Sequence, residues 1–419
     1  MKKIFRPAEI LLPKAQDMHR WSVVACDQFS SQPDYWEALE KLAEGVPSTL
    51  HLMLPEAYLE KRDQFVEAEK INAEMEQYLA DGVFEALPEC YIYVERALAS
   101  GTVRRGLMGV LDLEEYDYSP ESASPIRATE GTVVDRLPPR VRVRRGASIE
   151  MPHIMVFIDD AEDSVLGQLT AKKAQLPGLY DFELNAGGGH LKGFMVAGAD
   201  ATEIDKAIDG LGDMEVLRAR YGDKAPAIFA MGDGNHSLAT AKKCWEEVKP
   251  TLSEAERETH PARFGLVELV NIHDEAISFE PIHKVVFDTV PGDFVAEAET
   301  FWAGESRESQ KGHTIRLVVG ECEKELCVSG LTIGELIGKA EEFCQSYMAS
   351  HGGKIDYIHN DDTAIGMGRR EGCAAILLPR MEKGELFPSI IESGPFPKKS
   401  FSIGHAEDKR YYLECRKIK

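Results

Sequence analysis

The chain has 419 residues, of which 43% are hydrophobic and 28% charged, so it is long enough for two or three domains and has a globular composition. Its 71 acidic and 48 basic side chains give a formal net charge of −23, which disfavours general binding to nucleic acid. The eight cysteines form no CxxC pair and the first residues lack the apolar core of a signal peptide, so we expect reduced thiols and a cytoplasmic location. No stretch is long and apolar enough to cross a bilayer, and we expect no membrane partner.

The first candidate site residue is Asp27, which follows a short apolar run at 21–25 that we interpret as a strand. Pro33 then opens a predicted helix. A carboxylate beside a helix start suits a general base or a metal ligand, and a plain loop or capping role is the alternative. A long helix is predicted from Pro55 to about residue 79, and strands are predicted at 91–97 and 102–113.

A turn-rich loop at 119–125 leads to Arg127 and Glu130 and then to a basic segment, Arg136–Arg145. The alternative is a solvated loop with surface arginines, which we favour for each arginine taken alone. Together they favour the clamping of a compact anion, because guanidinium groups pair with phosphate oxygens in two-point contacts.

The next elements are a strand at 154–158, a helix at 163–173 and two strands, at 180–184 and 191–197, around a glycine run at 185–190. The run lacks the GxxxxGK[ST] pattern of a phosphate-binding loop and is followed by no helix. We therefore interpret it as the turn of a hairpin. A helix is predicted at 201–211.

The most informative stretch is FAMGDGNHSLATAKKCW, from Phe229 to Trp245. An apolar run at 225–231 predicts a strand, the glycines around Asp233 break it, and the apolar spacing after Asn235 predicts a helix. Such a junction leaves amide groups unpaired at the helix start, where the helix dipole favours a phosphate. The alternative is that Asn235 merely caps the helix and that His236 is a structural histidine.

The remainder mixes strands and helices without strict alternation. It includes a buried strand at 263–272, a hairpin at 313–328, a helix at 333–348 and a closing strand at 411–415. The loop residues Lys398, Lys399 and Ser400 offer two ammonium groups and a hydroxyl to phosphates. We expect an α+β or mixed α/β fold, not a doubly wound sheet.

Several motifs, in their order, resemble the DUF1015 family of uncharacterised bacterial and archaeal proteins over nearly the whole chain: VVACDQF, IRATEGT, GGGHLKGFMV, GDGNHSLATA and FPKKSF. The family's central motif, usually DGHHRYETA, is similar to the signature of the ParB/sulfiredoxin-like superfamily. That superfamily includes partition CTPases, sulfiredoxin and a free-serine kinase that uses ADP. The resemblance implies a ParB/sulfiredoxin-like core with large inserted and C-terminal α/β elements.

We expect three parts: an N-terminal α/β part of the core at 1–120, a central domain at 121–260 that carries the DGNHS motif, and a C-terminal α+β part at 261–419 that closes the site.

The resemblance also implies that the turn residues Asp233, Gly234, Asn235 and His236 bind nucleotide phosphates. Asp27 matches the aspartate of the family's N-terminal PPYD motif, and Lys398 to Ser400 match its Arg-Lys-Ser. The chain departs from the family where Ser237 replaces an arginine, where Asn235 replaces a histidine, and where Ala25 and Cys26 replace two prolines.

These residues lead to the hypothesis of a nucleotide-dependent phosphotransferase, a serine-kinase-like enzyme that uses ATP or ADP with Mg²⁺ and phosphorylates a small hydroxyl-bearing metabolite. The turn Gly234–Ser237 would hold the donor phosphates, and Asp27 or Asp233 would accept the acceptor's proton or hold Mg²⁺. His236 would stabilise charge. The remaining nucleotide-site residues are Arg127, Glu130, Lys398, Lys399 and Ser400.

The alternative hypothesis is a non-catalytic nucleotide or metabolite sensor. The replacement of the family's arginine by Ser237 favours this alternative. A third hypothesis, DNA partitioning in the manner of ParB, fits poorly because the chain is acidic and shows no separate basic helix-turn-helix.

Overall fold

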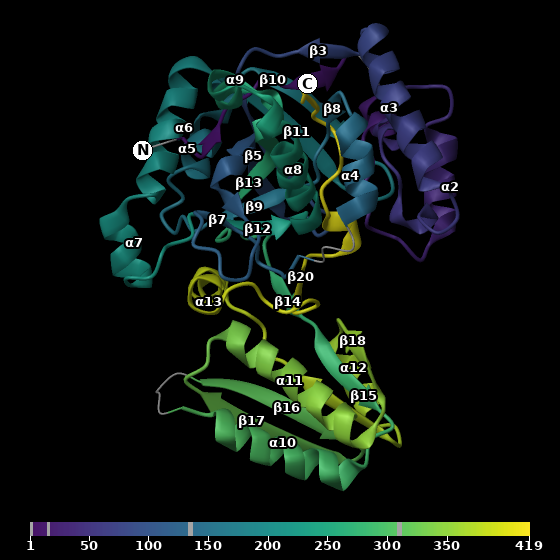
Figure 1. The fold of residues 1–419 in the computed structure, drawn as a ribbon, viewed down its shortest axis with the longest axis vertical. Helices are drawn as coiled ribbons and strands as arrows, with labels where there is room; N and C mark the ends of the chain where they lie inside the picture. The colour runs from purple at the N-terminus through teal and green to yellow at the C-terminus, as the bar shows by residue number, and fades with distance from the viewer. Residues whose placement is uncertain (1–2, 15–16, 133–136, 308–311) are drawn as a thin grey trace.

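The computed structural model describes residues 3–14, 17–132, 137–307 and 312–419, and its elements form two lobes (Figure 1). The first lobe is built on a mixed sheet, and the second on a smaller antiparallel sheet. The protein therefore has the expected mixed α/β fold, without the strict strand–helix alternation of a doubly wound sheet.

Within the described residues, the first lobe's sheet has ten strands in the order β10-β11-β4-β5-β13-β9-β12-β7-β6, with β1 paired to β5. The strands are β1 (Phe5–Arg6), β4 (Tyr91–Ala97), β5 (Val103–Asp112), β6 (Tyr116–Asp117), β7 (Ile126–Arg127), β9 (Met155–Ile158), β10 (Gly178–Glu183), β11 (His190–Val196), β12 (Phe229–Asp233) and β13 (Phe264–Asn271). Strand β13 runs parallel to β9 and antiparallel to β5, and β12 runs antiparallel to β9 and parallel to β7. One sheet thus draws its strands from both sides of the boundary expected at residue 120.

Both faces of this sheet are covered, as the alternation of β4 illustrates. Tyr91 and Tyr93 pack into one apolar cluster, while Ile92 and Val94 pack into another on the opposite face. Because both clusters are buried, the first half of the strand is a continuous hydrophobic run, and only Glu95 and Arg96 in its second half are charged.

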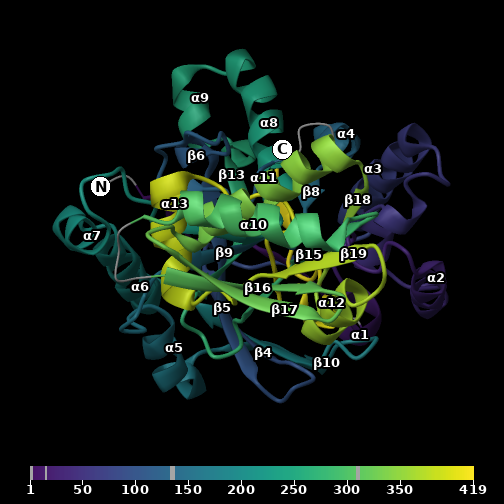
Figure 2. The same cartoon turned by 90° about the horizontal axis from the view of Figure 1, so that it is seen from below.

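Helices α5, α6 and α7 lie to one side of the first lobe, and α2, α3 and α4 lie to the other (Figures 1 and 2). The first lobe's helices are α1 (Met18–Trp21), α2 (Pro33–Leu42), α3 (Gln64–Ala80), α4 (Leu137–Gly146), α5 (Leu166–Lys172), α6 (Gly198–Leu211), α7 (Met214–Tyr221), α8 (Asn235–Val248) and α9 (Glu254–Thr259). Two small sheets complete this lobe. In one, β2 (Leu11–Pro13) pairs with β3 (Phe84–Ala86), and in the other, β8 (Ile149–Glu150) pairs with β21 (Arg416–Lys417).

The second lobe has the strand order β17-β16-β19-β15-β18, and every pair in it is antiparallel. Its elements are β15 (His283–Phe287), α10 (Pro291–Glu305), β16 (Gly312–Val319), β17 (Cys322–Ser329), α11 (Ile333–His351), β18 (Lys354–Ile358), α12 (Asp361–Gly368) and β19 (Cys373–Leu377). Helices α10 and α11 pack into the apolar cluster on one face of the sheet, and α12 packs on the other.

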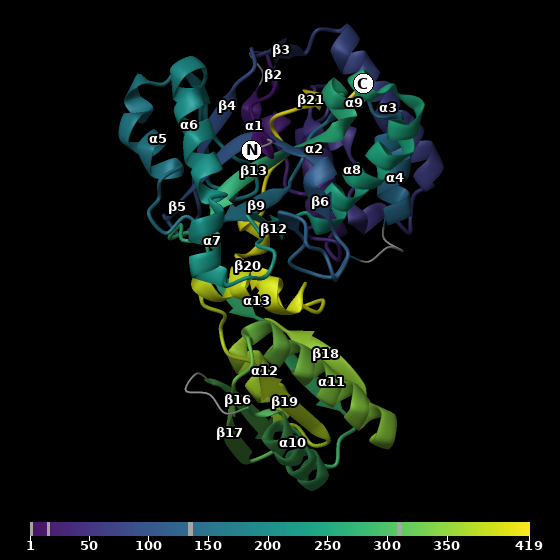
Figure 3. The same cartoon turned by 60° about the vertical axis from the view of Figure 1, so that its left-hand side comes forward.

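The chain passes between the lobes twice, through β14 (Phe279–Pro281) and β20 (Phe401–Ile403), which pair with each other. Helix α13 (Leu386–Ser393) lies beside this crossing, between the two lobes (Figure 3). After β20 the C-terminal residues return to the first lobe.

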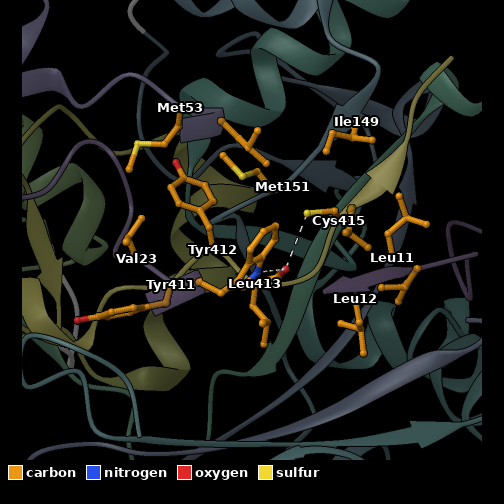
Figure 4. Close-up of a cluster of buried hydrophobic side chains, with 14 of the residues drawn as sticks. Leu11, Leu12, Val23, Met53, Ile149, Met151, Tyr411, Tyr412, Leu413 and Cys415 are labelled. Atoms are coloured by element: carbon orange, nitrogen blue, oxygen red, sulfur yellow. Dashed lines mark hydrogen bonds between the residues drawn. The ribbon is translucent and has the colours of Figure 1, made fainter. Parts of the chain in front are cut away.

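This C-terminal tail packs deep in the first lobe. The Trp21 indole donates to the Leu413 carbonyl at 3.1 Å, and Tyr411, Leu413 and Cys415 are buried (Figure 4). Residue Tyr411 pairs with Val24 and Cys415 with Leu11, each as a single bridge. The predicted strand at 411–415 is therefore wrong: successive residues pair with different segments, and only 416–417 form a strand.

Three other sequence predictions are corrected by the structure. The run at 21–25 is the end of helix α1 followed by a single bridge, because Asp17 caps a helix just before it. The long helix begins at Gln64, where the Asp63 carboxylate accepts from two backbone amides, and not at Pro55. The basic segment is helix α4, with Arg136 outside the described residues.

None of the helices in the described part of the chain combines the length and the apolar composition needed to cross a membrane.

Candidate functional site

The junction between β12 and α8 has the predicted strand–turn–helix form. Gly234 precedes the helix with a φ of +76°, and a Cβ atom on it would lie 3.0 Å from the Ile154 Cα. Both the positive φ and the close approach require glycine. The amides of Ser237 and Leu238 donate to the Gly234 carbonyl at 2.9 and 3.0 Å. Asn235 is the first residue of the helix, so its amide has no acceptor within the helix.

A cavity of about 180 Å³, here called the central cavity, lies in front of this helix start. It is lined by Asp27, Glu130, Arg140, His153, Asp233, Gly234, Asn235, His236 and Ser237. The fold thus brings Asp27, from the loop before α2, to the turn that the sequence singled out in the middle of the chain.

Asp27 lies opposite a buried histidine in the central cavity. The His153 Nε2 atom is 3.9 Å from the Asp27 Oδ2 atom and 3.4 Å from the Ser237 Oγ atom, and its Nδ1 atom is 2.8 Å from the Tyr412 hydroxyl. Tyr412 is buried, so it fixes the plane of the imidazole.

The surroundings of Asp27 keep its carboxyl group ionised. Burial raises its pKa, but the charge of His153, a hydrogen bond from Gln28 and the charges of Lys409 and Arg140 together lower it below the usual value. The carboxylate is therefore an anion throughout the neutral pH range.

A second cavity of about 260 Å³, here called the interlobe cavity, adjoins the central cavity and shares Glu130, Asp233 and Asn235 with it. Its other lining residues come from β12 and the segment after β7 in the first lobe, from the end of β18 in the second lobe, and from the crossing segments around β14 and β20 and the tail: Thr129, Gly232, Ile282, Tyr357, His359, Phe396, Pro397, Lys399, Ser400, Phe401, Ser402, Ile403 and Lys409. Both lobes therefore contribute to this cavity.

Two lysines line the interlobe cavity, together with the carboxylates of Glu130 and Asp233. The Lys409 Nζ atom lies 3.3 Å from the Asp233 Oδ2 atom, and the Lys399 Nζ atom lies 4.5 Å from the centre of the Tyr357 ring. Burial and the charges of Lys399 and Lys409 lower the pKa of His359. The Lys399 amide donates to the Glu130 Oε1 atom at 2.8 Å, which ties this loop to the first lobe.

One polar atom at the site is buried without a hydrogen-bond partner in the described structure: the Oδ1 atom of Asn235. Asn235 lines both cavities. Buried polar atoms are normally satisfied, so this oxygen is suited to accept a hydrogen bond from a bound molecule.

Within the described residues, no group of three or more histidine, cysteine, aspartate or glutamate side chains is arranged to hold a metal ion. Three carboxylates, those of Asp27, Glu130 and Asp233, nevertheless line the central cavity. Mg²⁺ commonly binds through one or two carboxylates together with phosphate oxygens of a substrate. The donor set fits a Mg²⁺ ion that binds with a nucleotide, and does not fit a closed metal cage.

Two predicted site residues line neither the central cavity nor the interlobe cavity. Arg127 is buried, and its guanidinium donates to the Ser124 carbonyl at 3.0 Å and to the Ala225 carbonyl, which holds the loop before β12. Lys398 is exposed. Its neighbour Ser400 lines the interlobe cavity, although its hydroxyl donates to the Pro397 carbonyl at 2.6 Å.

The basic segment contributes one residue, Arg140, to the central cavity. Arg140 pairs with Glu56, Arg144 with Glu150 and Arg145 with Glu247. Its charges are therefore largely compensated by carboxylates, and it is not an open anion clamp.

Sequence reasoning missed His153, Lys409 and Tyr412. His153 stands alone just before a predicted strand, and the other two lie in the tail, so no local pattern connects them with Asp27 or Asp233. The only sequence signal for Lys409 is that it is a basic residue just before the apolar run of the tail.

Replacing His153 with glutamine is expected to raise the pKa of Asp27, because the charge that lowers this pKa is removed while an amide remains for Tyr412 and Ser237. The carboxyl would then take up its proton at a higher pH than in the unaltered protein. Carboxylate titration by NMR measures this directly. His51→Gln is the matched control, since His51 also contacts a tyrosine hydroxyl, at 2.7 Å, but lines neither the central cavity nor the interlobe cavity. An unchanged Asp27 titration in His153→Gln would contradict the electrostatic coupling.

Comparison with solved structures gives similarities of low TM-score. A conserved hypothetical protein from Pyrococcus furiosus is 10% identical, with a TM-score of 0.32, over 74% of this chain and 94% of its own. A C-terminally truncated SbnI from Staphylococcus aureus is 10% identical, with a TM-score of 0.34, over 71% and 83%. A free serine kinase variant in complex with ADP is 9% identical, with a TM-score of 0.36, over 73% and 91%.

None of the curated proteins matches the sequence. The family model described as "Protein of unknown function (DUF1015)" matches residues 5–342, which is more than half of the chain. The motifs noted in the sequence, the strand–turn–helix junction and this match agree, and the chain belongs to the DUF1015 family.

Proposed function

We propose that the protein is a nucleotide-dependent phosphotransferase that acts on a hydroxyl group of a small molecule. The observation that carries the proposal is the central cavity, where a helix start, the ionised Asp27 and the adjoining lysines converge. The proposal stands on this geometry, because the similar solved structures are too distant to support it.

The turn Gly234–Ser237 and the lysines of the interlobe cavity are the proposed donor site. The start of α8 supplies a backbone amide and the positive end of the helix dipole. Lys409 and Lys399 supply the positive charge that a polyphosphate requires. They would substitute for the arginine that the family usually has at the position of Ser237. The Asn235 Oδ1 atom accepts a hydrogen bond from a donor group of the bound nucleotide.

In the proposed reaction, the acceptor's hydroxyl oxygen forms a bond to the terminal phosphorus of the nucleotide. The bond from that phosphorus to the bridging oxygen breaks, and the shortened nucleotide leaves with the electron pair. Asp27 orients the hydroxyl and accepts its proton, while His153 holds the carboxylate in place. Phosphoryl transfer depends mainly on positioning and charge neutralisation, so a weakly basic carboxylate is sufficient.

Asp233 and Glu130 are the residues proposed to bind Mg²⁺ together with the nucleotide phosphates. The ion would neutralise negative charge on the phosphate oxygens. Because Asp233 already contacts Lys409, binding of the ion would release that ammonium group toward the phosphates.

A non-catalytic sensor is the second candidate, and one observation favours it. The lowered pKa of Asp27 makes this carboxylate a poor base. A sensor would bind ATP or ADP with Mg²⁺ and leave the nucleotide unchanged after prolonged incubation with pooled metabolites, whereas the enzyme would convert it.

The donor site is tested by replacing Lys409 with methionine. The affinity for ATP or ADP with Mg²⁺ is expected to fall roughly ten- to hundredfold, because a charge-assisted contact to phosphate is lost. Isothermal titration calorimetry measures the dissociation constants.

Lys398→Met is the matched control for this experiment, since Lys398 lies in the neighbouring loop, is exposed and lines neither the central cavity nor the interlobe cavity. Its nucleotide affinity should equal that of the unaltered protein. Absence of any nucleotide binding by the unaltered protein would remove the proposal.

A further inference from the structure

A third cavity, here called the apolar cavity, adjoins the central cavity on the side away from the lysines. Its volume is about 180 Å³. Most of its lining is apolar: Leu52, Met53, Leu54, Leu59, Met75, Pro139, Val143, Ala147, Ile149, Met151, Pro152 and Ile154. Figure 4 shows Met53 and Met151 beside the Tyr412 ring at this wall.

The ionisable groups on the wall of the apolar cavity are neutral or paired, and His153 faces the Asp27 carboxylate at 3.9 Å. Arg140 pairs with Glu56, and Arg144 donates to Glu150 at 2.6 Å. Burial and the charge of Asp27 raise the pKa of the Cys26 thiol to about 12, so it is uncharged and unreactive near neutral pH. An ionic ligand therefore has no uncompensated counter-charge in this cavity.

The apolar cavity is continuous with the reacting end of the proposed site. It shares Arg140, His153 and Ser237 with the central cavity. The interlobe cavity instead shares Glu130, Asp233 and Asn235. The three cavities thus form one groove across the start of α8, with the Asp27–His153 pair toward the apolar end and the lysines toward the other end.

This asymmetry assigns the two substrates to opposite ends of the groove. A polyphosphate needs cations, which the interlobe cavity provides through Lys399 and Lys409. An apolar cavity is filled favourably by a hydrocarbon group, since each buried methylene contributes about 0.8 kcal/mol.

We infer that the acceptor is an alcohol with an apolar alkyl or aryl body, which fills the apolar cavity and presents its hydroxyl to Asp27. A small polar amino acid such as serine would leave this cavity without a matching group. The inference rests on the proposed phosphotransferase activity and adds the chemical class of the acceptor.

The inference is tested with linear 1-alkanols from ethanol to 1-hexanol as acceptors, with L-serine and glycerol as polar comparisons. With ATP or ADP and Mg²⁺ present, kcat/KM is expected to rise roughly fourfold for each methylene added until the cavity is full. Phosphorus NMR detects the alkyl phosphate formed. A flat or falling dependence on chain length, or serine as the best acceptor, would overturn the inference.

Two substitutions on the wall distinguish the cavity from other apolar surfaces. Val143→Phe, on α4, fills the cavity, and Leu54→Asn makes its wall polar; both side chains are half-buried. Each is expected to weaken 1-hexanol binding at least roughly tenfold, measured by saturation-transfer NMR, while the nucleotide dissociation constant stays within about twofold. Val248→Phe is the matched control, because Val248 is also a half-buried valine on a helix of this lobe but lines none of the three cavities.

Failure of the two hypotheses can be told apart. Alkanol binding is measured without nucleotide. If the unaltered protein binds 1-hexanol but no nucleotide, and Val143→Phe abolishes the 1-hexanol binding, the proposed function is overturned and an apolar ligand site remains. Nucleotide turnover without alkanol binding, or alkanol binding unaffected by both wall variants, would overturn only the acceptor class.

Discussion

Replacing Asp27 with asparagine is expected to lower kcat for phosphoryl transfer by about 10²- to 10⁴-fold, the usual contribution of a positioned base. The amide keeps the shape and the contact with Gln28 but can neither accept the proton nor carry the charge that faces His153. Nucleotide affinity should change little, because Asp27 lines the central cavity and not the interlobe cavity with its lysines. Steady-state kinetics with a 1-alkanol acceptor, combined with calorimetric nucleotide titration, measures both quantities.

A second aspartate–histidine pair provides the control for this experiment. The Asp361 carboxylate lies 2.9 Å from the His283 Nε2 atom in the second lobe, and Asp361 lines none of the three cavities. Asp361→Asn should therefore keep its kcat. Equal activity of Asp27→Asn and the unaltered protein would exclude Asp27 as the base and direct attention to Asp233.

Replacing Arg410 with methionine is expected to lower the free energy of unfolding by about 3–5 kcal/mol, the effect of removing one partner from a buried ion pair. The Arg410 Nε atom lies 3.0 Å from Glu268 and its Nη2 atom 2.5 Å from Glu414, and all three side chains are at most 4% exposed. Two carboxylates would remain buried without this cation, although Tyr180 still donates to Glu414 at 2.5 Å. Urea denaturation monitored by circular dichroism measures the change.

Arg369→Met is the comparison for Arg410→Met. Arg369 pairs with Glu323 at 2.5 Å, but both side chains are more than a third exposed. An exposed pair contributes at most about 1 kcal/mol, so this variant should unfold almost as the unaltered protein does. A double variant with Glu414→Gln should recover part of the stability lost in Arg410→Met, because one buried charge is removed with its partner. Additive losses would argue against coupling between these two residues.

Local patterns in the sequence were sufficient to predict the junction at Gly234 and the hairpin of β10 and β11, and the structure confirms both. In each case the signal is contained in a few consecutive residues: an apolar run followed by glycines, and at Gly234 also a change from strand to helical periodicity. Helix α4 was missed because the segment was interpreted as a solvated loop, although Pro138 and Pro139 are compatible with the first turn of a helix.

The composition of the cavities was less accessible to sequence reasoning. Arg127 and Arg140 are close along the chain, yet only Arg140 lines the central cavity. His153 and Lys409 lie 256 residues apart and flank the same turn through long-range packing alone. Convergence of this kind depends on the register of the sheet and the path of the tail, which no single stretch of sequence encodes.

The returning tail has a consequence for the order in which the protein matures. Lys409 and Tyr412 complete the two sides of the groove, and both follow every strand of the first lobe's large sheet along the chain. During translation, the ribosome therefore has to release these residues before either side can form. A nascent chain that stops short of residue 409 has no complete groove, so ligand binding reports whether synthesis has passed that point.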